Sequence, residues 1–374
     1  MCKIDWQKQY VDHPLWLWLL DIVVISLMTI LFSWLLVRST FTGDLFTSSA
    51  AIETPQLIDL YTLSTDNANL KSKSDVVLMP IDGCSRQDVT TVLQILQDLP
   101  VAAIGVDVSF PYPDSEDATL LEAIMADSRI VMASRENGSY FEGELMGNGV
   151  QFGTIQLDIN TRYDIVRTFT PALIGIDDTF PSLEVQLAQM VQPEACAYFP
   201  MDKSSYIAYA QVLFDTIPAR DLISDDADLD DIADLLDGKV VLLGDLEYVY
   251  DSYRTPLQPD MPGVVIHAYI LNTILRTRTI NELPTWVSWL LACIMAILFA
   301  WGLVFIKWRF GDAEGLVLRF VQILLALIIA IIGVLLFNLK DYYFNAEPIF
   351  FALAVQAVTL DIWMGIMKLI YDSK

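Results

Sequence analysis

The chain has 374 residues, of which 54% are hydrophobic and 18% are charged, and its formal net charge at pH 7 is −25. Residues 39–284 hold 38 acidic and 13 basic side chains, so this segment carries the whole net charge. Such an acidic surface repels nucleic acid and anionic lipid, which excludes a nucleic-acid-binding protein. It is compatible with cationic ligands, divalent metals or basic partners, but a soluble surface held away from an anionic membrane is the simplest explanation.

Four apolar stretches frame the acidic segment, at residues 15–37, 285–306, 316–338 and 347–371. Each has about 20 or more residues, which at ~1.5 Å per residue is enough to cross a hydrocarbon core of ~30 Å. We therefore expect four transmembrane helices, a short head at residues 1–14, and one folded domain at residues 38–284. The first span is expected to remain as a signal anchor, because it is long and no clear small-x-small cleavage site follows it.

Basic residues in the short loops predict the orientation of the chain. Those expected on one side of the membrane are Lys3, Lys8, Lys307, Arg309, Lys368 and Lys374, whereas the short loop on the other side has only Lys340. The positive-inside rule then places both termini in the cytoplasm. The acidic domain is expected outside, as in a multi-pass protein of the inner membrane.

Within the acidic segment, apolar runs and helical patterns alternate. Strands are predicted at residues 76–79, 101–106, 130–133 and 239–244, and helices at residues 88–99, 117–127, 182–191 and 266–275. Strand–helix–strand order at this pitch implies right-handed crossovers and a mainly parallel sheet, so the predicted fold is an α/β extracytoplasmic domain with four transmembrane α-helices. Residues 140–170 are polar, Gly-rich and alternating, which favours antiparallel strands.

An acidic run from Asp225 to Asp237 allows two interpretations. Asp226, Asp228 and Asp230 have the spacing of the first three ligands of an EF-hand calcium loop. However, the run also places leucine and isoleucine at helical spacing, and its sixth loop position is not glycine. We therefore expect an acidic amphipathic helix. The cysteines and histidines lack metal-ligand spacing, so no metal or other cofactor is expected, while a disulfide between Cys84 and Cys196 stays open.

Six short motifs follow one another through the acidic domain. They are Ile81-Asp82, Gly105-Val106-Asp107 with Phe110, Asp164-Ile165-Val166-Arg167, Pro181-Ser182-Leu183, Val240 to Gly244 with Asp251 and Thr255-Pro256, and Pro262-Gly263-Val264-Val265-Ile266-His267-Ala268. In this order and membrane frame they resemble the CHASE type 2 (CHASE2) sensor, an extracytoplasmic module of bacterial membrane receptors. The resemblance covers about residues 57–280. It implies a sensory role, three closing membrane helices and no catalysis by the domain.

Members of that family usually carry a cytoplasmic kinase, cyclase or other signalling domain after the closing helices. The sequence ends at Lys374, about three residues past its last apolar stretch, so we expect a separate membrane or cytoplasmic protein to receive the signal. The leading hypothesis is a sensor of a small ligand or an envelope condition. An accessory or scaffold subunit that binds another envelope protein is the alternative, and a homodimer stays open. An envelope hydrolase is the weakest, because no nucleophile–base arrangement or phosphate-binding loop is present.

Five polar residues are candidates for ligand binding. Asp82 and Asp107 directly follow predicted parallel strands, at the sheet edge where α/β proteins bind ligands. Asp245 and Asp251 follow a later strand, and His267 lies near the start of the last helix of the domain. Carboxylates at such an edge can hold a cation or take part in acid–base chemistry. They can equally cap helices or bind backbone amides, and His267 can be a hydrogen-bonded structural residue.

Four polar residues fall within or beside the apolar stretches at one depth. Asp21, Arg319, Gln322 and Asp361 all lie in the inner half of the bilayer if the predicted topology holds. Ionisable groups in hydrocarbon are costly and are usually paired. One interpretation is a single network in which Arg319 neutralises a carboxylate. The other is a docking face for a membrane helix of a partner.

Overall fold

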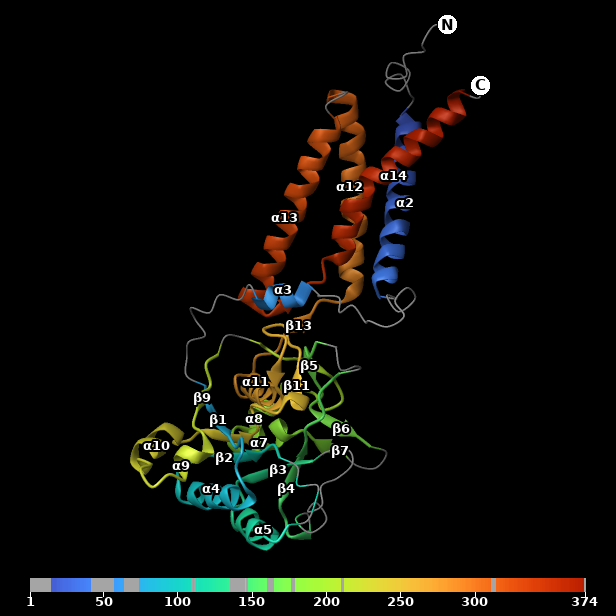
Figure 1. The fold of residues 1–374 in the computed structure, drawn as a ribbon. Helices are drawn as coiled ribbons and strands as arrows, with labels where there is room; N and C mark the ends of the chain where they lie inside the picture. Colours follow the sequence, from blue (N-terminus) through green and yellow to red (C-terminus); the bar gives the residue numbers. More distant parts are fainter. Residues whose placement is uncertain are drawn as a thin grey trace. The chain divides into compact units, whose positions relative to one another are not determined.

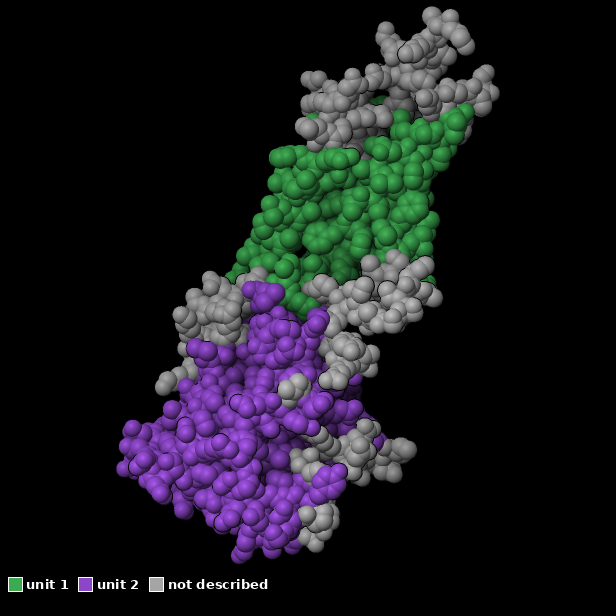
Figure 2. Space-filling model, viewed as in Figure 1, with its two compact units in different colours: residues 1–61, 281–374 green, residues 62–280 purple. Residues whose placement is uncertain are grey.

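The structure is a computed structural model that describes residues 15–41, 57–63, 74–108, 110, 112, 114–134, 145, 147–159, 165–175, 179–209, 212–310 and 314–372. The predicted head at residues 1–14 and Asp164 of the third motif lie outside these ranges. The chain forms two compact units, one of residues 1–61 with 281–374 and the other of residues 62–280 (Figure 2).

The first unit contains four helices that are long and apolar enough to cross a membrane, which confirms the predicted number. They are α2 (Leu15–Phe41), α12 (Thr285–Phe310), α13 (Glu314–Lys340) and α14 (Glu347–Asp372). The unit also holds the short helix α3 (Leu57–Leu63) and a two-residue parallel pair, β13 (Asn281–Glu282) with β14 (Tyr342–Tyr343). Tyr61 of α3 packs against Phe337 of α13, with ring centroids 5.9 Å apart.

The second unit is built on one six-stranded parallel sheet, which confirms the predicted fold class. In the order of the sheet, the strands are β4 (Gln151–Thr154), β3 (Ile130–Ser134), β2 (Ala103–Val106), β10 (Val240–Gly244), β1 (Val76–Pro80) and β9 (Asp215–Thr216). All residues of β2, β3 and β10 are buried. These strands are continuous apolar runs because helices cover both of their faces.

Helices lie on both faces of this sheet (Figure 1). One face is covered by α4 (Arg86–Asp98), α5 (Asp117–Ala126), α9 (Ala219–Leu222) and α10 (Leu229–Leu236), and the other by α7 (Leu183–Val191), α8 (Pro193–Cys196) and α11 (Gly263–Leu275). Side chains alternate along each strand, so Val77 and Met79 of β1 face α4 whereas Val76 and Leu78 face α11. Cys84 and Cys196 belong to opposite faces and are both free thiols.

Two parts of the domain test the finer sequence predictions. The acidic run forms helix α10, in which Asp228 is the N-cap and accepts a hydrogen bond from the amide of Asp231, so the amphipathic helix is confirmed. The antiparallel strands predicted for residues 140–170 are wrong for β4, which joins the parallel sheet beside β3. They are right for β5 (Thr168–Phe169), which pairs antiparallel with β8 (Ser205–Tyr206).

The remaining strands of the domain form two small antiparallel pairs. They are β6 (Ala172–Ile174) with β7 (Thr179–Pro181), and β11 (Ser252–Tyr253) with β12 (Met261–Pro262). A one-turn 3-10 helix, η3 (Val249–Asp251), precedes β11. The pair β6–β7 leads into α7, and the pair β11–β12 leads into α11. Each pair therefore sets where the following helix begins on the sheet.

Candidate functional site

The carboxyl edge of the parallel sheet gathers the acidic residues predicted from the sequence. Asp82, Asp107 and Asp245 follow the carboxyl ends of β1, β2 and β10, which are neighbours in the sheet. Asp251 ends η3, and His267 lies in the first turns of α11. The structure joins these residues in two groups, which have different chemistry.

The first group, here called the histidine cluster, consists of His267, Glu184 and Asp107. The Nδ1 atom of His267 is hydrogen-bonded to Oε1 of Glu184, and its Nε2 atom lies 3.9 Å from Oδ2 of Asp107. The three residues are buried, with exposed fractions of 3%, 2% and 9% respectively. Because Asp107 follows β2, Glu184 belongs to α7 and His267 belongs to α11, the cluster ties the end of the sheet to two of the three helices on this face.

Local sequence explains how the two helices bring their side chains together. Ser182 is the N-cap of α7 and accepts a hydrogen bond from the amide of Val185, which places Glu184 in the first turn. Gly153 of β4 allows this close approach, since a Cβ atom there would lie 2.3 Å from Cα of Leu183. Helix α11 begins at Gly263, where a Cβ atom would lie 2.6 Å from Oδ2 of Asp251. Glycine at this position therefore allows Asp251 to lie against the start of the helix that carries His267.

The histidine cluster is electrostatically unusual, since burial of His267 disfavours its charged form. The carboxylates of Glu184, Asp107 and Asp251 outweigh this effect and raise the pKa of His267 to about 9. The imidazole is therefore protonated at neutral pH and both of its nitrogens are donors. A protonated imidazole is neither a general base nor a metal ligand, so the cluster acts as a charged link between elements. His267 thus makes the hydrogen bond that a structural role requires, and a ligand at this residue stays a prediction.

The second group, here called the carboxyl pair, consists of Asp82 and Asp245. The hydrogen bond that its carboxyl group shares with Asp82 raises the pKa of Asp245, with partial burial acting in the same direction. Burial opposes ionisation of Asp82, but hydrogen bonds from Asp245 and from the backbone lower its pKa overall. Asp245 is therefore the more basic carboxyl group of the pair.

The carboxyl pair holds the loop that follows β10. Asp82 accepts hydrogen bonds from the amides of Leu246 at 3.0 Å and Glu247 at 2.7 Å, and Asp245 accepts from the amides of Glu247 and Tyr248, both at 2.9 Å. These are the backbone bonds anticipated as the alternative to ligand binding. The loop presents two tyrosines to solvent, with their ring planes tilted by 57°. The rings of Tyr248 and Tyr250 lie 5.6 Å apart, and the residues are 55% and 75% exposed.

The four polar residues of the membrane helices divide into buried and exposed positions. Asp21 is 2% exposed and accepts a hydrogen bond from Nε1 of Trp363 at 2.7 Å, and Gln322 donates to the carbonyl of Leu353 at 2.7 Å. Both bonds therefore tie a neighbouring helix to α14. Arg319 and Asp361 are exposed at the surface of their unit. Among the described residues, Arg319 makes no ion pair with Asp21 or Asp361.

Two buried polar contributions were not anticipated from the sequence. Glu184 is the central carboxylate of the histidine cluster, and its only signal is its place directly after Pro181-Ser182-Leu183, at the start of a helix. In the membrane unit, Thr29 and Thr359 are hydrogen-bonded at 2.9 Å, and Gln356 donates to the carbonyl of Ala296 at 2.6 Å. Hydroxyl and amide side chains are common in membrane helices, so their partners are visible only in the folded unit.

Comparison with known families decides the identity of the domain. The family model described as the CHASE2 domain matches residues 17–306 of the chain. The chain belongs to the CHASE2 family. CHASE2 is an extracytoplasmic sensory domain rather than a catalytic one, and the match includes most of α2 and most of α12. The resemblance found in the sequence motifs is therefore confirmed. No significant match was found among curated proteins or among solved structures.

Proposed function

We propose that this CHASE2 protein is a multi-pass inner-membrane sensor that reports a ligand or an envelope condition to a separate signalling protein. Both termini lie in the cytoplasm and the α/β domain lies outside, in agreement with the distribution of basic residues in the short loops. Asp82, Asp107, Asp245, Asp251 and His267 are the candidate residues for recognition at the carboxyl edge. The membrane helices carry the response across the bilayer to the partner.

The histidine cluster is the observation that supports this proposal most directly. It joins the end of β2 and the first turn of α7 to α11 through buried charges. Helix α11 ends at Leu275, and the chain enters membrane helix α12 at Thr285. A change at the carboxyl edge that moves Glu184 or Asp107 therefore acts on the helix that leads directly to a membrane span. Such a connection is what a sensor requires, and a passive anchor has no need of it.

The test compares cells that express the parent chain with cells that express Asp107→Asn or His267→Gln, at matched amounts in the membrane. Genome-wide transcript levels are measured while pH, osmolality and carbon source are changed in turn. A sensor gives transcript changes that depend on the parent chain and are lost in both variants. The proposal is refuted if no condition gives a response that depends on the parent chain. Two variants are used because either one alone can fail to fold, which melting of the purified chain detects.

The exposed tyrosines favour a second candidate function, an accessory or scaffold subunit that binds another envelope protein. Tyr248 and Tyr250 lie on a loop held by the carboxyl pair, and tyrosine is among the residues enriched at protein interfaces. In this case Tyr248→Ala with Tyr250→Ala abolishes co-purification of an envelope protein while every transcript response is retained. The sensor proposal instead predicts that variants of the histidine cluster lose the transcript response and still co-purify with any such envelope protein.

A further inference from the structure

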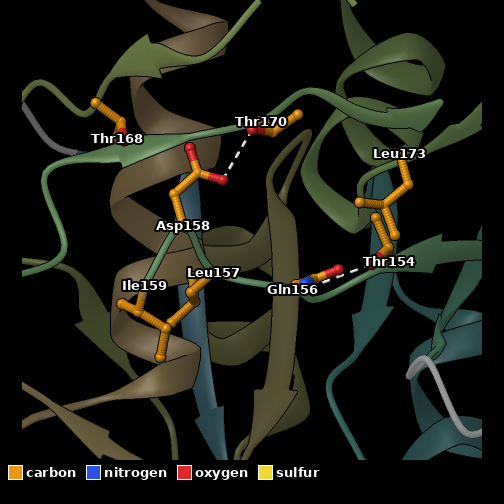
Figure 3. Close-up of a pocket in the computed structure, with 8 residues that line it drawn as sticks. All are labelled: Thr154, Gln156, Leu157, Asp158, Ile159, Thr168, Thr170 and Leu173. Atoms are coloured by element: carbon orange, nitrogen blue, oxygen red, sulfur yellow. Dashed lines mark hydrogen bonds between the residues drawn. The ribbon is translucent and has the colours of Figure 1, made fainter. Parts of the chain in front are cut away.

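A cavity of about 370 Å³ opens beyond the carboxyl end of β4, and its residues play no part in the histidine cluster or the carboxyl pair. Its size is at the lower end of the range for small-molecule sites, ~300–1,000 Å³. The lining residues are Thr154, Gln156, Leu157, Asp158, Ile159, Thr168, Thr170 and Leu173 (Figure 3). They come from the last residue of β4 and the segment after it, from β5 and the residue after it, and from β6.

The polar groups of this cavity are partly fixed and partly available. Asp158 accepts a hydrogen bond from the hydroxyl of Thr170 at 2.8 Å (Figure 3). It accepts a second one from the hydroxyl of Ser204 at 2.6 Å, and together they hold its carboxylate in place. The side-chain amide of Gln156 and the hydroxyl of Thr168 have no hydrogen-bond partner within the described part of the chain. The backbone amide of Gln156 also donates to Oγ1 of Thr154 at 3.2 Å (Figure 3). The side-chain amide of Gln156 and the hydroxyl of Thr168 therefore remain available to a polar ligand in the cavity.

The chemistry of the lining selects one class of ligand. None of the described lining residues is basic, and Asp158 repels anions, so a phosphate or a carboxylate is disfavoured. Within the described ranges the lining also lacks an aromatic side chain, so a flat ring has no stacking partner there. Hydroxyl, amide and carboxylate groups instead match the alternating donors and acceptors of a polyol. The aliphatic side chain of Leu173 can cover one of its C–H faces, whereas Leu157 and Ile159 pack on the core of the domain. We infer that this cavity binds a small neutral polyhydroxylated compound of the monosaccharide class.

The cavity lies next to the first turn of α7, and this part of the inference rests on the proposed sensory function. Thr154 forms a parallel β-bridge with Ser182, the N-cap of α7, and Glu184 of the histidine cluster follows two residues later. A ligand that closes on Thr154 therefore acts on the backbone that positions Glu184. The segment from Ser182 to Glu184 therefore contacts both the wall of the cavity and His267 of α11.

Binding is tested on the full chain in lipid nanodiscs, by calorimetry and by melting followed through tryptophan fluorescence. The neutral probes are D-glucose, N-acetyl-D-glucosamine and myo-inositol, with glucosamine as the matched cation and glucose 6-phosphate as the matched anion. We expect saturable binding of at least one neutral probe and a higher melting temperature in its presence. Thr168→Val and Asp158→Asn should each raise the Kd about fivefold to tenfold, as expected for one lost hydrogen bond. Thr216→Val, an exposed threonine of β9, is the matched control and should bind as the parent does.

Each other outcome contradicts the inference. It is overturned if the three neutral probes give no saturable binding up to ~50 mM, well above the millimolar range that corresponds to weak binding. Tighter binding of glucosamine or glucose 6-phosphate would assign the cavity to a charged ligand instead. An unchanged Kd in Thr168→Val and Asp158→Asn would place the bound sugar elsewhere. The proposed function fails separately: if sugar binds as expected but no transcript response depends on the chain, the site stands and the sensory function falls.

Discussion

Replacing Glu184 by glutamine tests the charge link in the histidine cluster. The substitution keeps the size and hydrogen-bonding capacity of the side chain but removes the carboxylate that contacts Nδ1 of His267. Burial favours the neutral imidazole, yet the surrounding carboxylates raise its pKa from 6.5 to about 9. At ~1.4 kcal/mol per pKa unit, this rise corresponds to about 3 kcal/mol of stability, of which Glu184 supplies the largest electrostatic part.

The sign of the pH dependence follows from linkage. A histidine whose pKa is higher in the folded state than in the unfolded state binds its proton more tightly when folded. Its stabilising contribution is complete below pH 6.5 and is lost as the pH rises through about 9. We therefore expect the parent domain to lose stability between these values, whereas Glu184→Gln should lose much less. The two proteins should differ most at pH 6 and converge above pH 9.

The assay is thermal melting of the full chain in nanodiscs, at pH values from 6 to 9.5. For a domain of 150–250 residues a change of 1 kcal/mol shifts Tm by ~2–4 °C. Because Glu184 supplies only part of the ~3 kcal/mol, Glu184→Gln should melt by up to roughly 6–12 °C below the parent at pH 6. Glu122→Gln is the matched control, because Glu122 is exposed on α5 at the other face of the sheet. A melting temperature of Glu184→Gln that follows the parent across the whole range would refute the charge link.

Three further predictions concern the topology, the loop after β10 and the membrane helices. A periplasmic-active reporter should be silent when fused after Lys374 and active when inserted near Asp226, and the reverse pattern would contradict the orientation. Asp82→Ala removes the acceptor of two loop amides, so amide exchange at residues 245–248 should rise with a stability loss of ~1–3 kcal/mol; unchanged exchange would show that Asp245 alone holds the loop. Asp21→Leu should weaken the membrane unit by ~0.6–2 kcal/mol because it removes the partner of Trp363, whereas Asp361→Leu should leave its melting unchanged and abolish co-purification of a partner that docks there. If Asp21→Leu and Asp361→Leu changed the melting temperature equally, the buried Asp21 and the exposed Asp361 would not have the different roles predicted here.

The central part of the fold could be predicted because its strands are buried on both faces. Such strands are unbroken apolar runs, and the helices between them show clear periodicity, so β1, β2, β3 and β10 were all located. Strands at the edges of the sheet gave no such signal. β4 contains an exposed residue and a glycine, and β9 is only Asp215–Thr216, so their place in the sheet depends on tertiary contacts rather than on local pattern.

Only the part of the site that depends on the order of the strands could be predicted from the sequence. Carboxylates that follow neighbouring parallel strands must share one edge, which is why Asp82 and Asp245 meet. The approach of Asp107 to His267 required the packing of α11 on the sheet, which no spacing reveals. Glu184 was missed because an acidic residue in a first helical turn is ordinary and usually faces solvent. Here it is 2% exposed, since Gly153 lets the start of α7 pack directly on β4.

The start of α7 connects the cavity beyond β4 to the histidine cluster. Ligand binding in the cavity and protonation of His267 are therefore expected to be thermodynamically linked. Thr154 lines the cavity and forms a β-bridge with Ser182. Glu184, two residues after Ser182, is hydrogen-bonded to Nδ1 of His267. If a ligand in the cavity shifts Glu184 relative to His267, it changes the pKa of the imidazole. By reciprocity, protonation of His267 must then change the affinity for that ligand by the same factor. A Kd measured at pH 7 and pH 9.5 should therefore differ in the parent and agree in Glu184→Gln. A Kd that is independent of pH in the parent would mean that the cavity and the histidine cluster act separately, even if each one functions.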